Sequence, residues 1–159
     1  MKNIKLLVVG TGSIGKRHIK NAISLGIKPK NIFAVDTQKK RLKEVKILGL
    51  NKVFEDFEQA LKEDFDAAII CSPTSLHISQ SIKIAKMKKH ILIEKPLDSN
   101  LKDSKKLVQL KKKNKLTIMI AYIFRFSEPI KFIKKELKKK SIGKILYFRG
   151  EFSEYLPDW

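Results

Sequence analysis

The stretch Ile4-Lys5-Leu6-Leu7-Val8-Val9-Gly10-Thr11-Gly12-Ser13-Ile14-Gly15 decides the fold of this chain. Its first six residues are mostly apolar and predict a buried strand, and an amphipathic helix pattern begins among the glycines. A G-x-G-x-x-G run between a strand and a helix is typical of a dinucleotide-binding βαβ unit. In such a unit Gly10 permits a tight turn, Gly12 lets the backbone approach a pyrophosphate, and Gly15 lets the helix pack closely on the strand.

The start of this helix predicts a phosphate site. The backbone N–H groups around Ser13 and Ile14 have no partner within the helix, and the helix dipole favours an anion there. The alternative is a glycine-rich turn without a ligand. The position between strand and helix favours the phosphate site.

The rest of the first 121 residues alternates strand-length apolar runs with helix-length amphipathic runs. Near-continuous apolar strands separated by helices predict a parallel sheet covered on both faces. Right-handed crossovers make this an α/β, doubly wound (Rossmann) domain. After the strand at 4–9, strands are expected at 31–35, 52–54, 67–70, 91–93 and 117–120, and helices at 14–25, 38–48, 76–88 and 101–113.

The pattern changes after residue 121. A helix is expected from Glu128 to about Lys140, and a long strand from Lys144 to Ser153. We therefore expect a Rossmann domain over 1–121 and, over 122–159, the first helix and strand of an incomplete α+β second domain. An unpaired strand exposes an edge. This predicts a homo-oligomer, or pairing with a missing C-terminal half.

Asp36 ends the second strand, about 20 residues beyond Gly15. That is the spacing of the acid that binds the adenosine ribose hydroxyls, so Asp36 favours NAD over NADP. Lys39, Lys40 and Arg41 follow and would weaken this preference, so NADP stays open as a cofactor. A helix N-cap is the alternative role for Asp36, and both roles are compatible.

Two further strand ends carry polar residues that we expect to line the cofactor cleft, because ligands bind beyond the carboxyl ends of parallel strands. One is Cys71-Ser72-Pro73-Thr74-Ser75-Leu76-His77, and the other is Glu94-Lys95-Pro96. Cys71 is interpreted as a buried strand-end residue rather than a nucleophile, and His77 alone as structural. Lys95 would orient a substrate hydroxyl and help to move its proton. An ordinary surface lysine is the alternative.

Composition excludes several classes of protein. Cys71 is the only cysteine of the 159 residues, so no internal disulfide and no cysteine-cluster metal site is expected. No apolar run reaches the roughly 18 residues of a membrane span, and the N-terminus has no secretory cleavage pattern. We expect a cytoplasmic protein with no membrane partner and no metal.

The formal net charge of +19 raises nucleic acid as a partner. However, arginine occurs only at positions 17, 41, 125 and 149, and the lysines are spread along the chain. Without a recognised nucleic-acid motif, this distribution favours a solvated lysine-rich surface. We expect no specific nucleic-acid partner.

Taken together, the motifs resemble the N-terminal half of the Gfo/Idh/MocA oxidoreductase family. The resemblance rests on Gly10-x-Gly12-x-x-Gly15-x-x-His18, Asp36, Ser72-Pro73-Thr74-x-x-His77, Glu94-Lys95-Pro96, Tyr122-x-x-Arg125-Phe126 and Ile142-Gly143-Lys144-Ile145. The Glu-Lys-Pro element is its most specific part.

The resemblance implies an NAD(P)-dependent dehydrogenase that passes hydride between nicotinamide and a secondary alcohol of a sugar, sugar nucleotide or polyol. It implies a catalytic Lys95 and, in the family, a frequent cis bond before Pro96. The cofactor-binding residues it implies are Gly10, Gly12, Ser13, Ile14, Gly15, Asp36, Cys71, Ser72, Pro73, Thr74, His77, Glu94, Lys95, Pro96 and Arg125.

Family members are about twice as long, and their second domain carries an Asp and a His of the proton-transfer machinery. This difference in length predicts a truncated chain that is inactive alone. The alternative hypothesis is a catalytically incomplete dinucleotide-binding module, acting as a remnant, a partner subunit or a redox sensor.

Overall fold

The computed structural model describes residues 3–50 and 52–151. It divides into two compact units, Met1–Tyr122 and Ile123–Trp159. The boundary falls close to the change of pattern in the sequence at residue 121.

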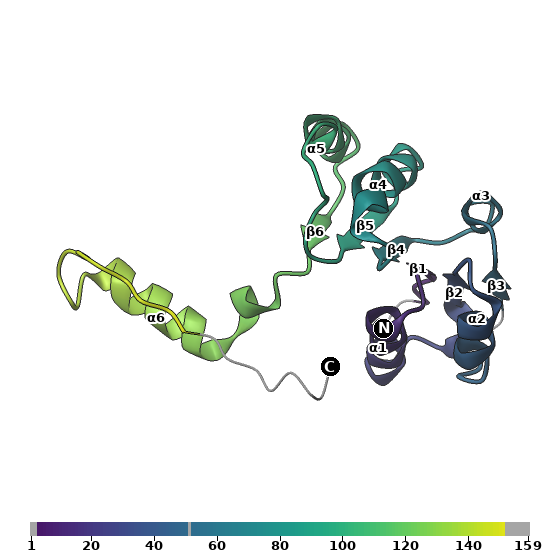
Figure 1. The fold of residues 1–159 in the computed structure, drawn as a ribbon, viewed down its shortest axis with the longest axis horizontal. Helices are drawn as coiled ribbons and strands as arrows, with labels where there is room; N and C mark the ends of the chain where they lie inside the picture. The colour runs from purple at the N-terminus through teal and green to yellow at the C-terminus, as the bar shows by residue number, and fades with distance from the viewer. Residues whose placement is uncertain (1–2, 51, 152–159) are drawn as a thin grey trace. The chain divides into compact units, whose positions relative to one another are not determined.

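The first unit is built on a parallel sheet (Figure 1). Among the described residues the sheet has six strands in the order β3-β2-β1-β4-β5-β6. Their bounds are β1 Leu6–Val9, β2 Ile32–Val35, β3 Lys52–Phe54, β4 Ala67–Ile70, β5 His90–Ile93 and β6 Ile118–Ile120. All neighbouring strands pair in parallel, which confirms the doubly wound α/β fold.

Helices cover both faces of the sheet. Residues of α1 and α2 pack in the cluster on one face, and residues of α3, α4 and α5 pack in the cluster on the other (Figure 1). The bounds are α1 Ser13–Ser24, α2 Lys39–Lys46, α3 Phe57–Ala60, α4 His77–Lys86 and α5 Ser104–Lys113, with 3₁₀ turns η1 Pro29–Asn31 and η2 Thr74–Leu76.

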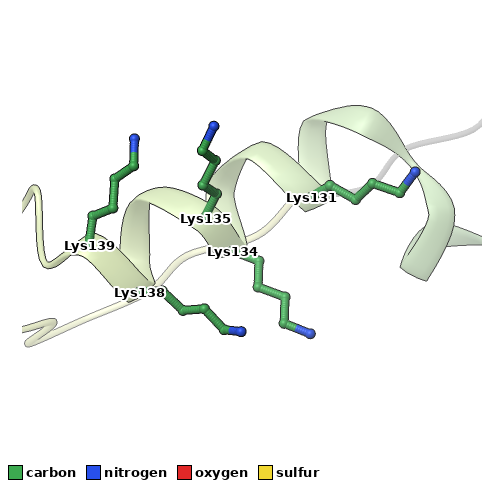
Figure 2. A pocket seen from close by; sticks show the side chains of 5 residues that line it. All are labelled: Lys131, Lys134, Lys135, Lys138 and Lys139. Atoms are coloured by element: carbon green, nitrogen blue, oxygen red, sulfur yellow. The ribbon is translucent and has the colours of Figure 1, made fainter.

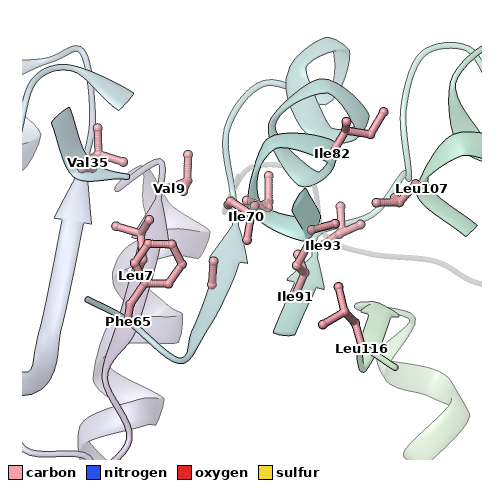
Figure 3. Packing of buried hydrophobic residues seen from close by; sticks show 14 of the residues in the cluster. Leu7, Val9, Val35, Phe65, Ile70, Ile82, Ile91, Ile93, Leu107 and Leu116 are labelled. Atoms are coloured by element: carbon pink, nitrogen blue, oxygen red, sulfur yellow. The ribbon is translucent and has the colours of Figure 1, made fainter. Parts of the chain in front are cut away.

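The two-sided cover explains why the strand sequences are apolar without alternation. In β1, Leu7 and Val9 belong to the core beneath α4 and α5, whereas Leu6 and Val8 belong to the core beneath α1 and α2. Successive side chains of a strand point to opposite faces, so a strand covered on both sides buries every residue. Figure 3 shows the larger cluster, in which the side chain of Phe65 lies beside that of Leu7.

In the first unit the expected strands and long helices are present, and their ends differ by a few residues. One helix was missed. The short helix α3 begins after Asp56, whose side chain accepts a hydrogen bond from the backbone N–H of Gln59 at 2.8 Å. A single turn is too short to show a helical period in the sequence, and its capping residue is its main local signal.

The second unit contains the 3₁₀ turn η3, Ile123–Phe126, and the helix α6, Glu128–Lys139. No residue of α6 is buried. Figure 2 shows five of its lysines, which line a shallow surface depression: Lys131, Lys134, Lys135, Lys138 and Lys139. Two of these lysines form ion pairs within the helix, Lys131 with Glu128 at 2.7 Å and Lys139 with Glu136 at 2.9 Å.

The strand expected over 144–153 is wrong for the described part of that segment. Residues 144–151 form no regular secondary structure, and residues 152 and 153 lie outside the described residues. A strand needs a neighbour for its N–H and C=O groups. Within the described residues none pairs with this segment. The edge strand that motivated the expectation of self-association is therefore not present over 144–151.

No helix within residues 3–50 and 52–151 has the length and apolarity needed to cross a membrane.

Candidate functional site

The register of the sheet gathers the polar strand ends at one edge. Val9, the last residue of β1, pairs with Val35 of β2 and with Ile70 of β4, and Ile70 pairs in turn with Ile93 of β5. The residues that follow these four strands therefore emerge side by side; they are Gly10, Asp36, Cys71 and Glu94. The strand order reverses between β1 and β4, so this edge lies at the switch point where open α/β sheets bind ligands.

Two glycines of the turn are required by the protein itself. Gly10 has φ +88°, and a Cβ on it would lie 2.5 Å from the carbonyl oxygen of Cys71. A Cβ on Gly15 would lie 2.0 Å from the carbonyl oxygen of Gly10. No side chain fits at either distance, which supports the tight turn assigned to Gly10 and the close helix packing assigned to Gly15.

Gly12 differs from these two glycines. Its φ is −62°, and a Cβ on it would meet nothing nearer than Nη1 of Arg41 at 3.9 Å. Gly12 is the N-cap of α1, no side chain caps that helix, and no acidic residue stands in its first turn. Since the first bond within the helix runs from the N–H of Lys16 to the oxygen of Gly12, the N–H groups of Ser13 and Ile14 have no acceptor in the helix.

Asp36 lies beside this turn, and its side chain is 5% exposed. Its Oδ2 accepts hydrogen bonds from the backbone N–H of Thr11 at 2.7 Å and from the Thr11 hydroxyl at 3.1 Å. Its Oδ1 accepts the N–H of Gln38 at 2.9 Å. Gln38, not Asp36, is the N-cap residue of α2, so the alternative role of Asp36 is wrong as stated. A carboxylate oxygen accepts two hydrogen bonds, so Oδ1 keeps one acceptor position.

Arg41 is the cation that faces this carboxylate. Its Nη1 lies 3.7 Å from Oδ2 of Asp36. Lys39, one of the other two basic residues after Asp36, pairs instead with Glu55 at 3.5 Å. Arg41 therefore lies close to both Gly12 and Asp36, where its positive charge partly offsets the negative charge of the carboxylate.

Cys71 directly follows β4, and its backbone lies against Gly10 of the glycine turn. Burial, together with the negative charge of Glu94, raises the pKa of the thiol to about 12. The thiol is therefore protonated at neutral pH and is a poor nucleophile, in agreement with its interpretation as a strand-end residue.

Glu94 directly follows β5 and is 9% exposed. Its Oε1 lies 2.7 Å from Nε2 of His18 on α1, and its Oε2 accepts the backbone N–H of Lys95 at 3.1 Å. This contact joins the helix that follows the glycine turn to the backbone of Lys95. From the sequence, His18 is named only as part of a family motif, and its contact with Glu94 is not predicted. The two residues are 76 positions apart, so no local sequence pattern indicates the contact.

The loop after β4 meets the loop after β5 through His77. This side chain is 2% exposed, and its ring nitrogens lie 2.8 Å from the carbonyl oxygen of Ser72 and 2.9 Å from that of Pro96. The Ser72 hydroxyl donates to Oε1 of Gln80 at 2.5 Å. His77 is thus structural, as interpreted from the sequence, and it joins both loops of the expected cleft.

Lys95 and Pro96 are both exposed. The bond between them is cis, as the family resemblance implies. Within the described residues no hydrogen bond or ion pair holds the Lys95 ammonium group. Pro73 is exposed and Thr74 half-buried, at the start of η2.

Arg125 belongs to η3 of the second unit and is exposed there. The other expected site residues all lie in the first unit at or next to the ends of β1, β2, β4 and β5. Among the described residues, no group of three or more His, Cys, Asp or Glu side chains is placed to hold a metal ion.

Comparison with known proteins agrees with this geometry. The sequence profile described as "Oxidoreductase family, NAD-binding Rossmann fold", the Gfo/Idh/MocA profile, matches residues 4–122. The chain belongs to the Gfo/Idh/MocA oxidoreductase family. The matched residues contain the glycine turn, Asp36 and the Glu94-Lys95-Pro96 element.

Members of the Gfo/Idh/MocA family that resemble the chain include two inositol dehydrogenases. The myo-inositol 2-dehydrogenase of Thermotoga maritima is 32% identical over 89% of this chain and 42% of its own length. The scyllo-inositol 2-dehydrogenase (NAD(+)) of Bacillus subtilis is 32% identical over 92% of this chain and 44% of its own length.

A solved structure of the same family also superimposes on the chain. It is scyllo-inositol dehydrogenase from Lactobacillus casei with bound NAD(H) and scyllo-inositol, with a TM-score of 0.79 and 28% identity. The superposition covers 90% of this chain and 43% of that chain. The chain therefore spans less than half the length of the relatives it matches.

Proposed function

We propose that the carboxyl edge of the sheet binds NAD and that the chain serves an oxidoreductase acting on a secondary alcohol of a sugar or polyol. The observation that carries the proposal is Gly12. The protein's own atoms leave room for a Cβ there, yet the residue has none, and the uncapped start of α1 lies beside it. A pyrophosphate needs both the space and the free N–H groups.

Each half of the dinucleotide has candidate contacts. Ser13 and Ile14 donate to the phosphates, and Asp36 accepts from a ribose hydroxyl through Oδ1. On the other side of the switch point, the candidates for the nicotinamide half are Cys71, Ser72, Pro73, Thr74, His77, Glu94 and Pro96. Bound NAD supplies a nicotinamide ring that accepts or donates hydride.

Lys95 is the candidate catalytic residue. Its ammonium group is exposed and unpaired among the described residues, while its backbone is held through Glu94. This combination suits a group that donates a hydrogen bond to the oxygen of a substrate hydroxyl and orients that hydroxyl while hydride leaves the carbon. The substrate class rests on the inositol dehydrogenases among the relatives.

NADH titration of the 159-residue protein tests the cofactor site. We expect saturable binding in the micromolar range, with NADH preferred to NADPH, measured by nicotinamide fluorescence and by calorimetry. No saturable binding of either nucleotide would contradict the proposal.

We also propose that these 159 residues alone do not turn over substrate, because the relatives use more than twice this length. Catalysis needs the substrate carbon held close to the nicotinamide, and positioning supplies a large share of the rate. Fusion to the remaining length of a close relative should give turnover with inositols. In that fusion, Lys95→Ala should lower turnover far more than it weakens NADH binding, and Lys102→Ala is the matched surface control.

The second candidate is a dinucleotide-binding module without catalysis, as a partner subunit or redox sensor. It would use the same nucleotide site at the carboxyl edge of the sheet. NADH binding by a fusion that never turns over any of a wide sugar panel would select this candidate.

A further inference from the structure

His77 makes an unusual pair of contacts. It is the first residue of α4 and is 2% exposed. Its Nδ1 lies 2.9 Å from the carbonyl oxygen of Pro96, and its Nε2 lies 2.8 Å from the carbonyl oxygen of Ser72. Both distances are those of ordinary hydrogen bonds.

Both partners of the ring are acceptors only. A neutral imidazole carries one N–H, and its other ring nitrogen carries a lone pair. In either neutral tautomer, one ring nitrogen of His77 would direct this lone pair at a carbonyl oxygen less than 3 Å away. Only a ring with two N–H groups satisfies both contacts, and an unsatisfied polar contact at a buried site is costly.

We propose that His77 is a positioning residue that carries two ring protons and, as an imidazolium, ties the Lys95-Pro96 backbone to the loop bearing Ser72. A charged donor makes shorter and stronger hydrogen bonds than a neutral one. Because Pro96 directly follows Lys95, its carbonyl is part of the backbone that directs the lysine into the cleft. The link to Lys95 rests on the proposed function, whereas the protonation of His77 does not.

A carboxylate accepts a hydrogen bond from the backbone of the residue that follows His77. Oδ2 of Asp98 accepts the backbone N–H of Ile78, the residue after His77, at 3.1 Å. Burial raises the pKa of Asp98, but hydrogen bonds from Ile78, Asn100 and Ser99 outweigh burial and lower its pKa below the ordinary value. Asp98 is thus ionised at neutral pH, at the positive end of α4.

The other titratable groups on this side of the switch point are Glu94, His18, Cys71 and Lys95. Glu94 follows β5 and pairs with His18 of α1, and Cys71 follows β4 with its thiol protonated. Lys95 is exposed. Glu94 adds a second negative charge to this edge of the sheet, on the same segment as Asp98.

Nitrogen NMR of the whole chain tests the protonation directly. The chain has three histidines, His18, His77 and His90. With ¹⁵N-labelled histidine at pH 7.5, we expect one imidazole to show two protonated ring nitrogens whose protons exchange slowly with solvent. Loss of this pair of signals in His77→Phe assigns it. If no imidazole of the wild-type protein shows two slowly exchanging ring protons, the proposal is wrong, and this outcome needs no variant to fold.

The positioning role has its own test. His77→Phe keeps a ring of similar size but removes both donors, and we expect NADH affinity to fall by about tenfold in the variant that remains folded. Ser79→Ala, an exposed position in the first turn of the same helix, is the matched control and should bind normally. Unchanged affinity in His77→Phe would overturn the positioning role. If wild-type protein binds no NADH, the proposed function fails, while the NMR experiment still decides the protonation.

Discussion

The two sides of the candidate site differ in what holds them in place. On the side of β1 and β2, backbone geometry forms the glycine turn, and Asp36 is joined to it by hydrogen bonds that its carboxylate accepts from Thr11. On the side of β4 and β5, the histidines His18 and His77 join segments that are 76 and 19 residues apart in the chain. A sequence motif of fixed spacing therefore identifies the first side, whereas the sequence indicates the residues of the second side without showing which of them are in contact.

The largest effect is expected from Gly15→Val. The new Cβ would lie 2.0 Å from the carbonyl oxygen of Gly10, so α1 must move away from the sheet. We expect a loss of at least about 3 kcal/mol of unfolding free energy, or no folded protein. Chemical denaturation followed by circular dichroism measures the loss. A variant as stable as wild type would show that the close packing of helix and strand is dispensable.

Gly12→Val tests whether the bound ligand, rather than the folded protein, needs a glycine at this position. Its Cβ meets no protein atom within 3.8 Å, so we expect stability within about 1 kcal/mol of wild type. NADH affinity should nevertheless fall by about 100-fold or more, because the side chain fills the space proposed for the pyrophosphate. Parallel denaturation and fluorescence titrations check both parts. Retained affinity in a folded variant would remove the proposed phosphate site.

Asp36→Asn tests the carboxylate without a change of size. The amide keeps an acceptor but loses the charge that repels a 2′-phosphate. We expect NADH to bind about tenfold more weakly, and the preference over NADPH to shrink or reverse. Calorimetric titration with NADH and with NADPH measures both affinities and therefore the preference. An unchanged preference would mean that Asp36 acts only on Thr11 and Gln38.

Arg41→Ala should act in the opposite direction. Removal of the guanidinium 3.7 Å from Asp36 leaves the carboxylate unopposed, so we expect the preference for NADH over NADPH to grow by a few fold. Lys39→Ala is the matched control, because Lys39 pairs with Glu55 rather than with Asp36. Equal effects of the two substitutions on titrations with both nucleotides would show that general positive charge, and not Arg41, sets the preference.

The smallest effect concerns Cys71. Since the pKa of its thiol is raised to about 12, the folded protein retains the proton at pH values where the unfolded chain loses it. The unfolded state then binds fewer protons, so this contribution to stability is present below about pH 9 and declines as pH rises toward 12. Alkylation of the folded protein by iodoacetamide at pH 8 should be much slower than alkylation of the unfolded chain. Equal rates would contradict the assignment of a buried, protonated thiol.

Much of the fold was predictable because its signals are local. Strands covered on both faces are continuous apolar runs, and the glycine turn follows the first of them directly. The short helix α3 was missed since one turn has no period. The strand expected over 144–153 was predicted from composition, but over 144–151 it has no neighbour among the described residues, and composition cannot supply one.

The sequence by itself determined the doubly wound fold, the position of the glycine turn, and the residue types at each strand end. These follow from hydrophobic periodicity and from the backbone freedom of glycine, both of which are read along the chain. Only the tertiary structure decided which of these residues meet. It showed that a Cβ would clash with the protein's own backbone at Gly10 and Gly15 but not at Gly12. It paired His18 with Glu94 and placed His77 between two carbonyls. Such contacts depend on the register of four parallel strands, and that register is set by packing across the whole sheet.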